Sequence, residues 1–232
     1  MNISDDLLTM IRFTTRSSAR RPAPRAPRVA GALSAVVLLV LAGCGSDDDA
    51  DDQVSDPTLS GIVRDPTPQV DLVALPSLSE PGENVEFRAD DGEIQVVYFG
   101  FTNCPDVCPT TLADLTVALR ILGEEEAGDV DVVMATVDPD RDLDLLDGYV
   151  TSFIPDATAV GTDDIELLQE AAAPFGASWE VRETDDGGIE VDHSPFLYAI
   201  DDEGQLVLTW QFGASSQDMA DDLSTLLDRA RA

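Results

Sequence analysis

Two cysteines, Cys104 and Cys108, lie four residues apart beside a segment with helical spacing. On a helical turn, residues at positions i and i+4 share one face, so both sulfur atoms should lie close together. Such a pair can close a disulfide or bind one metal ion. A helix N-terminus lowers the pKa of a nearby thiol, which predicts thiolate character suited to either task. A purely structural disulfide is the alternative, although a bridge across so short a loop removes little chain entropy.

The single histidine, His193, directly precedes a predicted strand at 196–200. If that strand neighbours the strand predicted at 94–100, the adjoining loops share one edge of the sheet, and two thiolates and one imidazole converge. Soft thiolates select Cu(I), and imidazole also suits Cu(II). Zn²⁺ held by two cysteines and one histidine, with one open position, is chemically allowed as well. The alternative is a surface or core histidine without a ligand role.

The elements that must position these residues alternate between strand and helix. Continuous apolar runs predict buried strands at 94–100 and 130–137, and leucines at helical spacing after Pro109 predict a helix. The remaining predicted elements are helices at 143–153 and 165–175, a short strand at 157–160, hairpins formed by 179–182 with 189–191 and by 196–200 with 206–212, and a last helix capped by Ser215 or Ser216.

This order predicts an α/β fold with a central mixed β-sheet, α-helices on both of its faces and an added β-hairpin. The cysteine pair directly follows the first central strand and precedes a helix, which favours the thioredoxin-like class. In open α/β sheets, sites tend to form at the carboxyl ends of strands. The predicted fold therefore places Cys104 and Cys108 where a site is expected.

Residues 1–43 have the composition of an export signal. Six arginines precede an apolar run at 29–43, which is short for a membrane span but fits the apolar region of a secretory signal. The run ends in Leu-Ala-Gly-Cys, which resembles the bacterial lipobox, so Cys44 is the predicted lipidation site. A short membrane anchor with an incidental cysteine is the alternative, and Met10 is an alternative start.

Cleavage before Cys44 leaves an acidic, proline-containing tether at 44–68 and a folded domain at 69–232. The predicted location is the cell membrane, with the lipid-anchored protein on its extracytoplasmic face. That compartment permits disulfides, and once one cysteine is assigned to the lipid, the other two remain as a pair.

The charge excludes some classes of partner. The 232 residues carry 46 acidic side chains against 13 basic ones, for a formal net charge of −33. Nucleic-acid binding needs a basic footprint, and anionic lipid surfaces also repel an acidic domain. A protein partner should therefore present a basic patch.

Three motifs, in order, resemble the SCO/SenC family. They are Tyr-Phe-Gly-Phe-Thr-Asn-Cys-Pro-Asp-Val-Cys-Pro at 98–109, Val-Asp-Pro-Asp-Arg-Asp at 137–142 and Asp-His-Ser at 192–194. The agreement extends over residues 71–230. The resemblance implies a thioredoxin-like fold, a place on the outer face of a membrane and copper bound by two cysteines and one histidine. On this sequence the implied copper ligands are Cys104, Cys108 and His193.

The resemblance also implies a function in assembling the CuA centre of cytochrome c oxidase. The implied partners are the CuA domain of oxidase subunit II and an upstream copper donor. The alternative function is a thiol–disulfide oxidoreductase that keeps the oxidase's copper-site cysteines reduced. In that case Cys104 attacks and Cys108 resolves the mixed disulfide. The copper function is favoured because it alone gives His193 a task.

Two further residues are predicted near the site. Asp138, at the end of the strand at 130–137, is a candidate hydrogen-bond partner of the site or, alternatively, the opener of an Asp-Pro turn. Ser194-Pro195 resembles in position the cis-proline that faces the cysteines in thioredoxins, whereas an ordinary trans bond is the simpler expectation. Arg141 is expected to pair with local acids.

Overall fold

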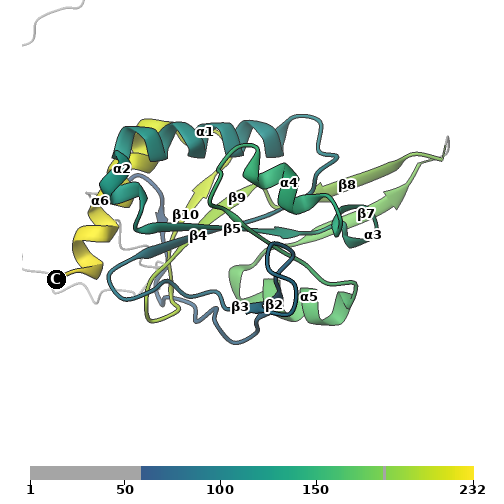
Figure 1. The fold of residues 1–232 in the computed structure, drawn as a ribbon, viewed down its shortest axis with the longest axis horizontal. Helices are drawn as coiled ribbons and strands as arrows, with labels where there is room; N and C mark the ends of the chain where they lie inside the picture. The colour runs from purple at the N-terminus through teal and green to yellow at the C-terminus, as the bar shows by residue number, and fades with distance from the viewer. Residues whose placement is uncertain (1–58, 185–186) are drawn as a thin grey trace, which may run out of the picture. The chain divides into compact units, whose positions relative to one another are not determined.

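The computed structural model describes residues 59–184 and 187–232 (Figure 1). Its main sheet has six strands in the order β1-β10-β9-β4-β5-β6. These strands are β1 (Ile62–Val63), β4 (Ile94–Gly100), β5 (Val130–Thr136), β6 (Thr158–Val160), β9 (Phe196–Ile200) and β10 (Leu206–Gln211). The neighbours β4, β5 and β6 are parallel, whereas β9 is antiparallel to β4 and β10. The predicted mixed sheet is confirmed.

Helices cover both faces of this sheet, as predicted. The helices are α1 (Val107–Leu122), α2 (Glu124–Ala127), α3 (Pro139–Asp142), α4 (Leu146–Thr151), α5 (Ile165–Ala172), the 3₁₀ turn η1 (Ala173–Phe175) and α6 (Ser216–Ala230). Figure 1 shows α1 and α6 together on one side of the sheet and α5 on the other, beside β2 (Leu75–Pro76) and β3 (Asn84–Val85). All seven residues of β4 are buried, because a sheet covered on both faces needs apolar side chains on both.

Two strands outside the main sheet form the added hairpin. They are β7 (Trp179–Glu183) and β8 (Ile189–His193), and they project from the body of the domain in Figure 1. The predicted turn residues 185 and 186 lie outside the described residues.

The helix predicted at 143–153 is wrong in its extent. The chain instead forms α3, which begins at Pro139, and a separate α4 that begins at Leu146. The buried carboxylate of Asp142 is hydrogen-bonded to Thr102 and Thr136, which fixes the end of α3 against the sheet and separates the two helices.

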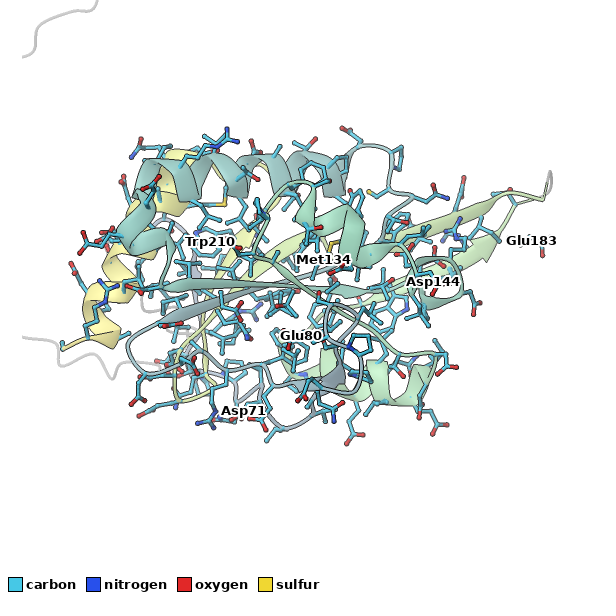
Figure 2. The ribbon with its side chains drawn as sticks, viewed as in Figure 1. Asp71, Glu80, Met134, Asp144, Glu183 and Trp210 are labelled. Atoms are coloured by element: carbon cyan, nitrogen blue, oxygen red, sulfur yellow. The ribbon has the colours of Figure 1, made fainter. Side chains whose placement is uncertain are left out.

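The described part of the predicted tether contributes to the domain. Residues 62–63 form β1 at the edge of the sheet, paired with β10. The fully buried Asp222 of α6 accepts hydrogen bonds from the backbone N–H of Ser60 (2.7 Å) and Gly61 (3.0 Å) and from Nε1 of Trp210 (2.7 Å). Figure 2 shows Trp210 inside the molecule, beneath the α1–α6 layer. The predicted signal at 1–43 and Cys44 lie outside the described residues.

Among the described helices, none has the length and apolar character that crossing a membrane requires.

Replacing Asp222 with alanine should lower the free energy of unfolding by about 3 kcal/mol, because three donors lose a buried charged acceptor. Urea denaturation of the purified protein measures the change. Asp228, exposed on the same helix, is the matched control, and Asp228→Ala should change stability by less than about 0.5 kcal/mol. Equal stabilities for the two variants would show that Asp222 does not anchor the start of the domain.

Candidate metal centre

The sheet topology brings the two cysteines and the histidine to one edge. Cys104 lies in the loop between β4 and α1, and Cys108 lies in the first turn of α1. His193 is the last residue of β8, and only Ser194 and Pro195 separate it from β9. Because β9 runs antiparallel to β4, with Tyr98 opposite Leu197, the start of β9 lies beside the end of β4. The predicted adjacency of these strands is confirmed.

The candidate ligand atoms are close together. One atom each from Cys104, Cys108 and His193 lies within 4.8 Å of the other two. The Cys108 sulfur is 3.5 Å from Nε2 of His193, and both cysteines are free thiols. A single ion can therefore contact all three side chains after small adjustments.

The imidazole of His193 is oriented for binding through Nε2. Its Nδ1 lies 3.1 Å from the carbonyl oxygen of Ser194, an arrangement in which Nδ1–H donates and Nε2 keeps its lone pair. The ring meets Phe101 edge-on, with centroids 5.6 Å apart, and Tyr98 in a similar way at 6.0 Å. Burial lowers the pKa of His193, so the ring is neutral near pH 7 and able to act as a ligand.

The two thiols differ in environment. Cys104 is half-buried, whereas Cys108 is fully buried. Burial raises the pKa of Cys108 to about 12, so for this residue the predicted thiolate character is wrong in the metal-free protein. Desolvation outweighs the helix N-terminus here. The backbone N–H of Cys108 instead donates to the Cys104 sulfur at 3.2 Å, so this N-terminal donor serves Cys104.

The cysteine loop is held by the buried carboxylate of Asp142, a residue that was not predicted to support the site. Asp142 is fully buried and accepts hydrogen bonds from the N–H (3.0 Å) and hydroxyl (2.6 Å) of Thr102 and from the hydroxyl of Thr136 (2.8 Å). Thr102 lies two residues before Cys104. Because Gly100 and Thr136 are paired at the ends of β4 and β5, the segments that follow both strands start side by side. Asp142 therefore fixes the cysteine loop to the end of β5.

Asp138, the residue predicted to support the site, has other partners. Its carboxylate forms an ion pair with Arg141, as expected for that arginine. Within residues 59–184 and 187–232 it has no hydrogen bond to Cys104, Cys108 or His193. The Ser194-Pro195 peptide bond is trans, since Asp65-Pro66 is the one cis bond in the described part of the chain.

A cavity of about 510 Å³ is lined by His193, whereas neither cysteine lines it. It lies between the root of the β7–β8 hairpin and the start of β9, and its lining includes Trp179, Asp192 and Phe196. The exposed carboxylate of Asp192 pairs with Arg182 on the neighbouring strand. Cys108 is thus buried, whereas His193 borders a cavity.

Fold and site together define a thioredoxin-like α/β protein with two cysteines and one histidine poised around one position. Residues 77–228 match the family model SCO1/SenC. The solution structure of apo Sco1 from Thermus thermophilus is 30% identical, with a TM-score of 0.63 over 73% of this chain and 97% of that chain. The chain therefore belongs to the SCO1/SenC family.

Two more relatives bear on the site. The structure of Bradyrhizobium japonicum ScoI with copper bound is 28% identical, with a TM-score of 0.57 over 66% of this chain and 96% of that chain. A SCO2-like protein of Rickettsia prowazekii is 31% identical over 131 residues, or 55% of this chain. The match spans 63% of that relative, a little under two thirds of its length.

Proposed function

We propose that this protein is a membrane-tethered, extracytoplasmic copper chaperone that assists assembly of the CuA centre of cytochrome c oxidase. The observation that carries the proposal is the convergence of Cys104, Cys108 and His193 within 4.8 Å. Two sulfurs and an imidazole suit copper in both oxidation states. The copper-bound structure of a relative supports the choice of metal.

In the proposed site, the Cys104 and Cys108 sulfurs and Nε2 of His193 hold one copper ion as cargo. Transfer proceeds by ligand exchange with thiols or imidazoles of the receiving protein. The more exposed Cys104 and the cavity beside His193 are where exchange begins, because Cys108 is sealed in the core. The proposed partners are an upstream copper donor and the CuA domain of oxidase subunit II.

Membrane attachment is proposed through a lipid on Cys44, from the lipobox-like sequence Leu-Ala-Gly-Cys. The acidic segment after it would hold the domain away from the membrane. The strongly negative chain favours a receiving surface with basic side chains.

Copper titration followed by transfer tests this function. The reduced protein is titrated with Cu(I) and Cu(II), and the loaded form is mixed with an apo CuA domain. One copper bound per chain and appearance of the CuA spectrum are expected. Binding without transfer to the CuA domain would contradict the chaperone function.

His193→Ala should lower Cu(II) affinity by at least about tenfold and change the Cu(II) spectrum, because the nitrogen ligand is lost. Glu190→Gln, an exposed change on the same strand, is the matched control and should leave both unchanged. Unchanged Cu(II) affinity and spectrum in His193→Ala would rule out the three-ligand site.

Copper affinity should also rise with pH. Burial raises the pKa of Cys108 to about 12, so its thiol is protonated near neutral pH and copper must displace that proton. Each proton released raises the apparent affinity about tenfold per pH unit. His193, whose pKa is lowered, is already neutral there and releases none. Titrations between about pH 7 and 9 check this, and a pH-independent affinity would contradict it.

A thiol–disulfide oxidoreductase is the second candidate function, favoured by two adjacent free thiols of which Cys104 is the more exposed. This function predicts that an oxidised CuA-domain peptide is still reduced by His193→Ala but not by Cys104→Ser. Copper delivery instead requires both residues.

A further inference from the structure

Two buried hydroxyls beside the candidate metal centre have no hydrogen-bond partner. Tyr98 on β4 is fully buried, and Thr111 on α1 is 6% exposed. Neither hydroxyl makes a hydrogen bond in the described part of the structure. An unpartnered buried hydroxyl lowers the stability of the fold, so its presence calls for an explanation.

Tyr98 and Thr111 both lie near Cys108. A Cβ atom placed on Gly100 would lie 2.7 Å from Cε1 of Tyr98 and 3.2 Å from the Cys108 sulfur. The tyrosine ring and the sulfur therefore both lie beside Gly100, which has no side chain. Burial raises the pKa of the Tyr98 phenol, and the nearby Cys108 thiol and Thr111 hydroxyl also act on it, although neither contact meets the geometry of a hydrogen bond. Thr111 follows Cys108 by three residues and shares its face of α1.

Met134, the other neighbour of this Cβ position, has no hydrogen-bond donor. The Cε methyl of Met134 lies 3.0 Å from the same Cβ position, and Figure 2 shows Met134 in the interior of the domain. A thiolate enclosed by apolar groups alone is strongly disfavoured, whereas one that accepts a hydrogen bond is stabilised. A hydroxyl can donate and accept at once.

We propose that Tyr98 is a positioning residue whose hydroxyl donates a hydrogen bond to the Cys108 sulfur when that sulfur binds copper as a thiolate. Thr111 completes the chain by donating to the Tyr98 oxygen. In the metal-free protein the two hydroxyls have no partner, and they gain these hydrogen bonds when copper binds. This inference rests on the proposed copper function and adds a residue to it. Hydrogen bonds to a copper-bound sulfur tune the electronic properties of the metal.

Tyr98→Phe tests the inference because it removes only the hydroxyl. In the metal-free protein the melting temperature should stay the same or rise, since an unpartnered group is lost. In the loaded protein, Cu(II) affinity should fall about tenfold and the sulfur-to-copper charge-transfer band should shift. Thr111→Val should produce the same changes at smaller size.

Tyr198→Phe is the matched control. Tyr198 on β9 is also fully buried with an unpartnered hydroxyl, but it packs on Phe99 and Phe175, on the opposite face of the sheet from Tyr98. Its copper affinity and charge-transfer band should equal those of wild type.

Three outcomes would overturn the inference. If Tyr98→Phe had wild-type copper affinity and a wild-type charge-transfer band, the Tyr98 hydroxyl would have no influence on copper binding. A lower melting temperature in metal-free Tyr98→Phe would indicate a merely structural tyrosine. A wild-type protein that binds no copper would overturn the proposed function itself, and this inference with it, so the two failures are distinguishable.

Discussion

Replacing Cys108 with serine should abolish tight copper binding, with a loss of affinity above about 100-fold. Loss of partners that merely orient ligands costs 10–100-fold, and loss of a ligand costs more. The change is nearly isosteric, so the fold should persist around the buried position. Competition titration of the reduced protein with a Cu(I) chelator measures the affinity.

Thr110→Ala, an exposed change in the same helical turn, is the control and should bind copper like wild type. Cys104→Ser should lose affinity to a comparable degree, because both sulfurs are proposed ligands. Cys108→Ser that retained copper within a few-fold of wild type would mean that the buried sulfur is not a ligand.

Asp142→Ala should have the largest effect on stability, with a loss of about 3–5 kcal/mol in the free energy of unfolding. Three donors, two of them on Thr102, would be left without their buried carboxylate. The cysteine loop would no longer be fixed to the end of β5, so copper affinity of the folded fraction should fall about tenfold.

Chemical denaturation and copper titration of the same sample separate these two effects. Asp140→Ala is the matched control, because Asp140 is exposed on the same short helix. If Asp142→Ala lost stability while its folded fraction bound copper as wild type does, Asp142 would hold the fold but not the site.

The central fold was predictable because its signals are local. The strands at β4 and β5 follow from continuous apolar runs, which only a sheet covered on both faces requires. The helix that contains Cys108 follows from leucines that recur at helical spacing, of which Leu112 and Leu115 are fully buried in α1. By contrast, β1 has two residues and depends on pairing with β10, which no local pattern in the predicted tether indicates.

The site was predictable in part. The convergence of His193 with the cysteines required only that β4 and β9 be neighbours. The choice between Asp138 and Asp142 could not be made from sequence. Both carboxylates follow β5 and both are buried, but only the backbone path of α3 decides which one faces Thr102.

Burial also reversed one electrostatic expectation. The position of Cys108 in the first turn of α1 predicts a lowered thiol pKa, whereas its complete burial raises that pKa. Degree of burial depends on packing from distant segments, including Tyr98 and Met134 around Gly100. Sequence spacing carries no information about it.

The proposed site holds one copper ion between the sulfurs of Cys104 and Cys108 and His193. X-ray absorption spectroscopy of the Cu(II)-loaded protein at the copper edge tests it most directly, because it identifies the atoms bound to the metal. Two sulfur neighbours and an imidazole nitrogen are expected, with the imidazole contribution lost and both sulfurs retained in His193→Ala. A copper shell of oxygen and nitrogen atoms without sulfur would contradict the account.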